Sequence, residues 1–87
     1  MYYVYILYSE SFDKFYIGQT NDLANRVKRH NAGSELYTKR YIPWILKWST
    51  QKPTRAEAMV LEKKLKNLSK KRLLIFMEKY SAGPDES

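Results

Sequence analysis

Two short segments rich in aromatic and β-branched residues lie close together near the N-terminus, and they constrain the fold most. Residues 2–8 read YYVYILY and contain no Gly or Pro, and residues 13–17 read DKFYI. Such segments are typical of β-strands, and only the short stretch 9–12 separates them. A connection this short predicts an antiparallel hairpin, so the chain is expected to begin with two paired strands.

The expected register of this hairpin brings two tyrosines together. Pairing of Tyr8 with Asp13 would close the loop. Tyr5 then lies opposite Tyr16 on the same face, with Cβ atoms about 5 Å apart. Gly18 is expected to end the second strand, where the missing Cβ allows a sharp bend or the close approach of a ligand. The side chains expected on the other face are those of Val4, Ile6, Phe15 and Ile17.

A helix is expected next, with a polar cap among residues 20–22 and an end near residues 32–33. Its short apolar stripe begins at Leu23. At 100° per residue, Arg26 lies about 60° and His30 about 20° from Leu23 around the helix, so both border the inward stripe. They can therefore reach the sheet face that carries the tyrosines.

The middle of the chain predicts a loop and a third strand. Residues 34–41 are polar and are expected to form an exposed connection. Residues 44–50 alternate in a strand pattern, and the prolines at positions 43 and 53 bound them. This alternation predicts one face with Trp44, Leu46 and Trp48 and an opposite face with Ile45, Lys47 and Ser49.

Two helices are expected to complete the chain. Residues 54–57 form a capping box, in which the threonine hydroxyl and the glutamate carboxylate each satisfy a backbone N–H. The helix that follows runs to about Leu68, and Glu62 lies only about 40° from Ala58 on its apolar stripe. An acidic side chain is thus directed close to the core. Ser69 is expected to cap the last helix.

These elements predict one α/β (α+β) domain, with a three-stranded antiparallel sheet flanked by helices in the order β-β-α-β-α-α. The domain is expected to span residues 1–80, with a disordered tail at 81–87, because 87 residues leave no room for a second core. The chain has no Cys, which excludes disulfides and favours a reducing, cytoplasmic location. No apolar run approaches the ~20 residues of a membrane helix. We expect no membrane partner, and a monomer with a dimer as the alternative.

The positive charge is concentrated in one part of the sequence. The net charge is +7, and residues 26–80 carry fifteen basic against four acidic side chains. Such a distribution attracts polyanions and suggests a nucleic-acid partner, although a solvated basic face is the plainer alternative. The residues assigned here to nucleic-acid contact are Gln19, Arg29, Lys39, Arg40, Lys70, Lys71 and Arg72.

An ordered set of short motifs resembles the GIY-YIG endonuclease superfamily, and most closely its small single-domain members. The resemblance covers residues 2 to about 78. Tyr3 stands where the family has its first glycine, and Gln19 stands where relatives often have lysine. The asparagine that some relatives place after the glutamate has no clear match. The motif residues are Tyr3-Val4-Tyr5, Tyr16-Ile17-Gly18, Leu23, Arg26, His30-Asn31 and Glu62.

The resemblance implies a metal-dependent endonuclease, and the chemistry of phosphodiester hydrolysis assigns the roles. Arg26 would stabilise transition-state charge with its guanidinium, and Glu62 would hold Mg²⁺ or Mn²⁺ with waters completing the shell. Tyr5 is the candidate general base, and Tyr16 would position water or the phosphate. A phenol has a pKa near 10, so Tyr5 needs nearby cations or a proton acceptor, for which His30 is the candidate.

Plainer interpretations remain beside each role. Strand tyrosines are often only packed, Glu62 can pair with Lys66 one turn away, and His30 can be a partner of the helix dipole. The expected substrate is DNA, with branched or damaged DNA in repair or recombination as the suggested context and RNA left open. The alternatives are a nucleic-acid-binding module with weak or no turnover, suggested by Gln19, and an accessory protein that docks on a larger repair enzyme. No small-molecule cofactor is expected.

Overall fold

A computed structural model describes residues 1–80, so the predicted disordered tail at 81–87 lies outside the described residues. The element order is the predicted one, and it confirms an α+β fold. The elements are β1 (Tyr2–Ser9), β2 (Lys14–Thr20), α1 (Leu23–Asn31), a 3₁₀ helix (Thr38–Tyr41), β3 (Ile45–Lys52), α2 (Arg55–Lys66) and α3 (Lys70–Lys79).

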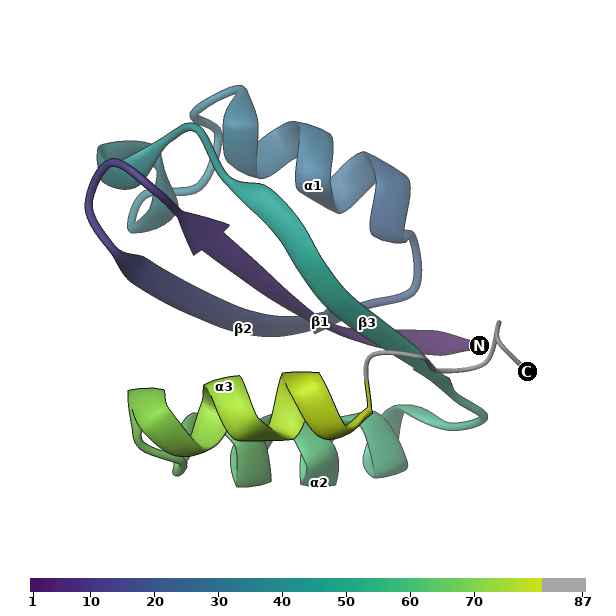
Figure 1. Cartoon of the computed structure of the whole chain (residues 1–87). Helices are drawn as coiled ribbons and strands as arrows, with labels where there is room; N and C mark the ends of the chain where they lie inside the picture. The colour runs from purple at the N-terminus through teal and green to yellow at the C-terminus, as the bar shows by residue number, and fades with distance from the viewer. Residues whose placement is uncertain (81–87) are drawn as a thin grey trace.

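The three strands form one antiparallel sheet in the order β2-β1-β3. Helix α1 covers one face, and α2 and α3 cover the other (Figure 1). The first strand in sequence is therefore the central one, whereas β2 and β3 each keep one edge without a strand neighbour. No helix among residues 1–80 is long and apolar enough to cross a bilayer.

Each face of the sheet has its own core. Toward α2 and α3, the predicted apolar set is confirmed, because Val4, Ile6 and Ile17 are buried together and Phe15 packs against them. The helices contribute Ala58, Leu65 and Leu73 to this core. Toward α1, the buried residues are Tyr5, Leu7 and Trp44, with Tyr16, Leu23, Val27 and Tyr41 packed against them.

The predicted hairpin register is wrong by two residues. Tyr8 pairs with Phe15 and not with Asp13, so Tyr5 lies opposite Gly18. The turn keeps the expected four residues but lies one position later, at 10–13, and it includes Asp13 with φ of 52°, a conformation that few residues other than glycine adopt. A shift of two preserves the alternation of side chains, so both tyrosines still share one face. Gly18 does not end the strand, because β2 continues to Thr20.

The predicted faces of the third strand are wrong because β3 contains a β-bulge. Ile6 pairs with Trp48 and Leu7 with Leu46, which leaves Lys47 as an extra residue on β3. The two tryptophans, expected on one face, consequently pack on opposite faces: Trp48 against the core under α2, and Trp44 within the core under α1. The strand also begins and ends later than the predicted 44–50.

The predicted exposed connection at 34–41 is only partly exposed. Lys39 and Arg40 are exposed as expected, but Thr38, the residue directly before them, is only 1% exposed. The indole Nε1 of Trp44 donates to the Thr38 carbonyl at 2.8 Å. A buried indole N–H needs an acceptor, and this need draws the 3₁₀ helix against the core.

Local end signals fix the helices that carry the candidate site. Asp22 caps α1 by accepting from the Asn25 N–H, and Gly33, with φ of 80°, closes its C-terminus. The N–H of Gly33 bonds to the His30 carbonyl and the N–H of Ser34 to the Arg29 carbonyl, which is the Schellman pattern. The predicted Thr54 cap of α2 is confirmed by its bond from the Glu57 N–H, although α2 ends at Lys66, two residues before the predicted end.

Candidate active site

Tyr5 lies at the centre of the candidate site and depends on Gly18. Tyr5 is fully buried on β1, and its ring crosses the backbone of Gly18 on the neighbouring strand. A Cβ built on Gly18 would lie 2.5 Å from the Tyr5 Oη and 2.7 Å from its Cζ. The missing Cβ therefore admits the protein's own tyrosine ring, and not a bend or a ligand as expected from the sequence.

This contact makes Gly18 a sensitive position. We expect Gly18→Ala to lower the free energy of unfolding by about 1–3 kcal/mol, because the buried Tyr5 ring cannot move away freely. The measurement is urea unfolding, with NMR of the His30 ring to detect displacement of Tyr5. Gly33→Ala is the control: its positive φ costs about 1 kcal/mol, but the nearest atom to its Cβ is 3.8 Å away. A Gly18→Ala protein as stable as the parent, with an unchanged His30 signal, would contradict the steric role.

A buried chain of three polar side chains starts at Tyr5. The Tyr5 hydroxyl lies 2.9 Å from His30 Nε2, and His30 Nδ1 lies 2.8 Å from Thr38 Oγ1. His30 comes from the last turn of α1 and is 1% exposed. With a neutral imidazole, a Tyr5 O–H that donates to Nε2 leaves the Nδ1–H to donate to Thr38. His30 is thus more than a partner of the helix dipole.

Asn31 and Trp44 hold this chain in place from outside. The Asn31 side chain accepts from the Trp44 backbone N–H at 2.6 Å and donates to the Trp44 carbonyl at 3.0 Å. Trp44 in turn donates its indole N–H to the carbonyl of Thr38. Through Trp44, Asn31 therefore fixes the segment that carries Thr38, the last member of the Tyr5–His30–Thr38 chain.

Tyr16 lies between the buried pair and solvent. Its ring centroid is 6.4 Å from that of Tyr5 and 5.0 Å from that of His30, and the side chain is half-buried. It is a diagonal neighbour of Tyr5 across the hairpin, since its direct partner is Leu7. The predicted proximity of the two tyrosines is confirmed, while the predicted pairing is not.

Arg26 on α1 and Glu62 on α2 both affect the pKa of the Tyr5 hydroxyl. Burial is the main cause that raises the pKa of the Tyr5 hydroxyl, and the Tyr16 hydroxyl raises it further. The positive charge of Arg26 on α1 lowers this pKa, and the carboxylate of Glu62 on α2 raises it. Both charges thus act on the same hydroxyl, although their helices lie on different layers (Figure 1).

The direction of this shift bears on how Tyr5 could act as a base. The sequence analysis named nearby cations or a proton acceptor as the requirement, and here desolvation outweighs Arg26 and raises the pKa of Tyr5. Tyr5 therefore keeps its proton at neutral pH. It can lose that proton only to a neighbouring acceptor, and His30 Nε2 is in hydrogen-bond contact.

The buried imidazole predicts a pH dependence of stability. Burial lowers the pKa of His30, the charges of Arg26 and Arg29 lower it further, and Glu35 opposes them. The unfolded chain then binds more protons than the folded one below about pH 6.5, so stability is present above this pH and falls as the pH drops below it. Unfolding free energies between about pH 5 and 7.5 should show this slope, and a His30→Gln protein should lack it. Parallel slopes in the two proteins would refute the assignment.

Glu62 is the only candidate metal ligand that the sequence singled out. Its side chain is 20% exposed and forms an ion pair with Lys66 at 2.9 Å. The pairing with Lys66 that was the alternative to a metal-binding role is therefore present. Among residues 1–80, no group of three or more His, Cys, Asp or Glu gathers to hold a metal. One accessible carboxylate suits Mg²⁺, which keeps most of its waters and often uses one or two protein ligands.

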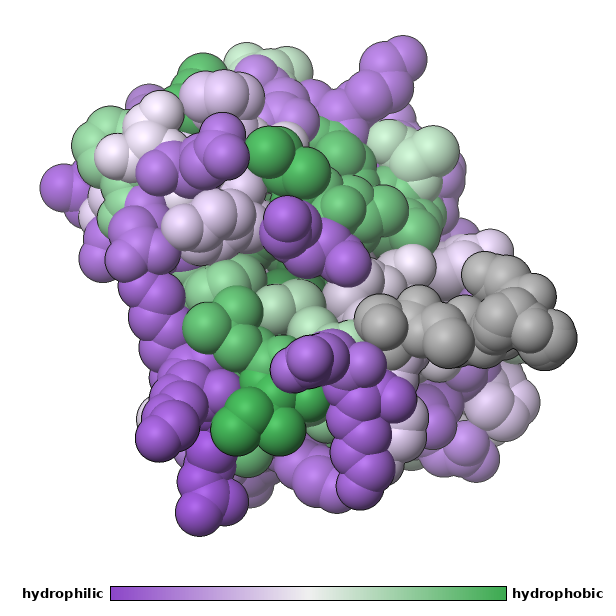
Figure 2. Space-filling view, viewed as in Figure 1, coloured by the Kyte–Doolittle hydropathy of each residue, from purple (hydrophilic) through white to green (hydrophobic). Residues whose placement is uncertain are grey.

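The residues assigned to nucleic-acid contact lie on four different elements. Gln19 lies on β2 near the candidate site, and Arg29 on α1 is paired with Glu35 at 3.1 Å. Lys39 and Arg40 lie on the 3₁₀ helix. The cations at the start of α3 border exposed apolar residues such as Leu74 and Ile75, and Figure 2 shows apolar beside hydrophilic surface over this helix. The α3 cations of the assigned set are Lys70, Lys71 and Arg72.

Sequence reasoning missed three residues that shape the site: Thr38, Trp44 as its partner, and Tyr37. Thr38 looked like one more polar residue in a loop, and nothing in its neighbours distinguishes it. Asn31 was part of the recognised motif, but its bonds to Trp44 were not foreseen. The spacing of tyrosines at 37 and 41 on a 3₁₀ turn was the one available signal for an aromatic wall beside Tyr16.

The fold and these residues define a GIY-YIG domain. The chain matches the family model of the GIY-YIG catalytic domain over residues 1–80, and it belongs to that family. This membership indicates nuclease chemistry and a nucleic-acid substrate. The chain is 39% identical over 67 residues to the UPF0213 protein YazA of Bacillus subtilis (strain 168), covering 76% of this chain and 68% of YazA. It is also similar to the solution NMR structure of the UPF0213 protein BH0048 from Bacillus halodurans, with TM-score 0.58 and 33% identity over 99% of this chain and 92% of that one. The resemblance to small GIY-YIG proteins is thereby confirmed.

Proposed function

We propose that this protein is a metal-dependent endonuclease that hydrolyses phosphodiester bonds in DNA. The observation that carries the proposal is the Tyr5–His30–Thr38 chain beside Tyr16, at a hydroxyl that both Arg26 and Glu62 influence. These groups can supply a base, a cation and a metal ligand, which phosphodiester hydrolysis requires. We further propose a cytoplasmic location and a role on branched or damaged DNA.

The half-buried groups Tyr16 and Arg26 meet the substrate first. Arg26 binds two phosphate oxygens with its planar guanidinium and stabilises the negative charge that develops on them. Tyr16 donates its hydroxyl to the phosphate or the attacking water and sets the direction of attack. Because Tyr5 is fully buried, water reaches its hydroxyl only when the side chains around it move on binding of the phosphate.

Tyr5 then takes the proton of the attacking water. Its own proton passes along the 2.9 Å contact to His30 Nε2, which avoids a free tyrosinate. The Thr38 hydroxyl accepts from Nδ1–H and stabilises the imidazolium that forms. Glu62 would hold Mg²⁺ or Mn²⁺, and such an ion, when bound, acts as a Lewis acid that stabilises the leaving oxygen.

The direct test is cleavage of labelled branched and linear DNA by the full chain. We expect cutting with Mg²⁺ or Mn²⁺, loss of cutting with EDTA, and recovery when excess metal is restored. Arg26→Ala protein, purified in the same way, controls for a contaminating nuclease. Equal cutting by the two preparations, or cutting that persists in EDTA, would rule out the proposed function.

A nucleic-acid-binding module with weak turnover is the second candidate. Two observations favour it: Tyr5 has no exposed surface, and the carboxylate of Glu62 is already paired with Lys66. In that case the same assay shows salt-dependent DNA binding without metal-dependent products. The two candidates are thus separated by one set of reactions.

A further inference from the structure

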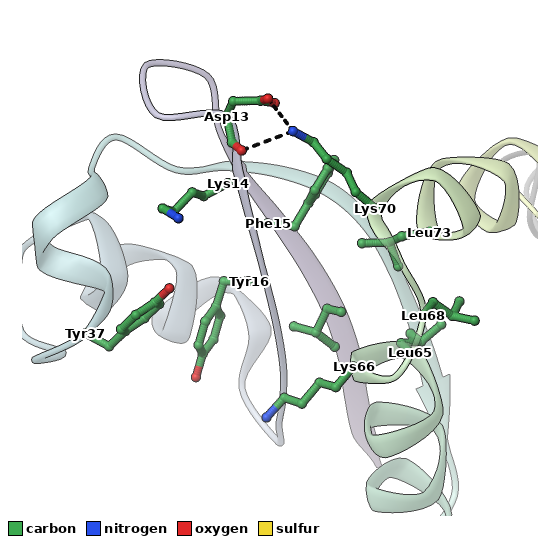
Figure 3. Close-up of a pocket in the computed structure, with 11 residues that line it drawn as sticks. Asp13, Lys14, Phe15, Tyr16, Tyr37, Leu65, Lys66, Leu68, Lys70 and Leu73 are labelled. Atoms are coloured by element: carbon green, nitrogen blue, oxygen red, sulfur yellow. Dashed lines mark hydrogen bonds and ion pairs between the residues drawn. The ribbon is translucent and has the colours of Figure 1, made fainter.

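A pocket of about 410 Å³ lies along the free edge of β2, directly beside the candidate active site (Figure 3). It straddles this strand. Tyr16 and Tyr37 line it on one side of β2, and Phe15 and the α2–α3 junction line it on the other. Because Tyr16 also belongs to the candidate active site, the pocket and that site are continuous.

The pocket has an aromatic wall that is open to solvent. The Tyr37 ring centroid lies 6.2 Å from that of Tyr16 and 5.3 Å from that of Tyr41. Tyr37 is nevertheless 50% exposed, so part of its side chain is open to a ligand. Nucleic-acid bases stack on such rings regardless of sequence, because every base has a π-face. Apolar side chains of the helical layer complete the lining, namely Leu65, Leu68 and Leu73.

Three lysines give the pocket a positive rim. Lys70 is held by Asp13, the single acidic residue in the lining, and Lys66 by Glu62. Lys14 makes no ion pair within residues 1–80, and its Nζ lies 5.4 Å from the centroid of the Tyr41 ring. Its charge is therefore available to a phosphate. Cations beside an open aromatic wall fit a nucleotide better than a peptide strand.

The size of the pocket selects against paired bases. Its volume is at the lower end of the range of about 300–1000 Å³ for small-ligand sites. A base within a duplex is stacked on both faces and hydrogen-bonded to its partner, so it reaches a recess of this kind only when it leaves the helix. The pocket can accept an unpaired nucleotide directly.

We propose that this pocket holds an unpaired nucleotide of the DNA strand that is cut, with its base against Tyr37 and its phosphate near Lys14. The inference rests on the proposed function and adds the substrate class: DNA with a single-stranded nucleotide next to the scissile bond. Tyr37 and Lys14 are binding residues in this proposal and take no part in proton transfer.

The test measures binding by the full chain in EDTA, where no cleavage occurs. The probes are a fluorescent oligothymidylate, an abasic strand of the same length and a blunt duplex, followed by fluorescence anisotropy. We expect the oligothymidylate to bind most tightly, and Tyr37→Ala to weaken it about 5- to 100-fold without weakening the duplex or the abasic strand. Equal losses on all three probes, or no loss on oligothymidylate, would overturn the proposal.

Two variants control for structure. Tyr37→Phe keeps the ring and should bind like the parent. Tyr80→Ala removes an equally exposed ring, 48% exposed, at the end of α3 and outside this pocket, and should also bind like the parent. A loss in Tyr80→Ala equal to that in Tyr37→Ala would contradict a specific stacking site.

NMR of the unaltered chain keeps the proposal testable if Tyr37→Ala does not fold. Oligothymidylate should shift the backbone amides of Lys14, Ile17 and Lys70 and leave that of Tyr80 unchanged. Shifts confined to the outer face of α3, or shifts caused by an extended peptide but not by oligothymidylate, would refute it. Tyr37-dependent binding without any DNA cleavage would refute the proposed function alone, whereas cleavage without preference for unpaired nucleotides would refute only this inference.

Discussion

Arg26→Ala should lower kcat/KM for DNA cleavage about 100- to 1000-fold, the loss typical when a preorganised charge on a transition-state oxyanion is removed. Arg26 is half-buried on α1, and its charge already acts on the Tyr5 hydroxyl in the absence of substrate. Arg26→Lys should recover only part of the rate, because an ammonium group cannot bind two phosphate oxygens with a planar fork. Initial rates with Mg²⁺ measure both effects.

The matched control is Arg55→Ala, which removes an exposed arginine at the start of α2. Its rate should stay within a few-fold of the parent, since loss of one distant cation changes only the overall attraction of DNA. Circular dichroism checks that both variants are folded. Similar losses in the two proteins would show that Arg26 acts through net charge, and would remove it from the candidate catalytic set.

Glu62→Gln should reduce cleavage by about 100-fold or more at a fixed Mg²⁺ concentration, because the amide keeps the shape of the side chain but loses the charge that holds the metal. The fold should be little affected. The only ion pair lost within residues 1–80 is the one to Lys66, and a helical pair of this spacing contributes about 0.3–0.5 kcal/mol. Part of the rate should return at high Mg²⁺ or Mn²⁺.

Glu57→Gln is the control on the same helix. Glu57 lies in the first turn of α2 and is exposed, and glutamine is also accepted at this position of a capping box. It should leave both the rate and its metal dependence unchanged. A Glu62→Gln protein that cuts DNA at the parental rate at every metal concentration would reduce Glu62 to the helix-surface pair with Lys66.

The predictions that succeeded depended on local signals. The Thr54 cap and the glycine at position 33 mark helix ends through bonds to their own neighbours, and the structure confirms both. Of the predicted capping box it shows the bond from the Glu57 N–H to the Thr54 hydroxyl. The tyrosines at 5 and 16 share a face because side chains alternate along each strand, whatever the register. Periodicity and capping signals therefore predicted the sheet and the helices, whereas the candidate site residues were named from the family resemblance.

The predictions that failed depended on contacts between distant segments. The hairpin register is the local exception, because the four-residue turn lies one position later than predicted and includes Asp13 at a positive φ. The faces of β3 follow from the bulge at Lys47, which arises in the pairing with β1 and leaves no mark in the local pattern. The burial of Thr38 depends on the indole of Trp44. These features exist only once the layers are packed.

The central place of β1 bears on how the chain reaches its native state. Its hairpin with β2 is local, whereas its pairing with β3 joins residues 37 to 50 positions apart, as in Tyr8 with Ile45 and Tyr2 with Lys52. Contacts of large sequence separation form late, because closing the intervening loop costs entropy first. During synthesis on the ribosome, one edge of the apolar strand β1 therefore stays unpaired until residues 45–52 have been made. An apolar strand with an unpaired edge is prone to aggregation, so we expect this interval to be a vulnerable stage of synthesis.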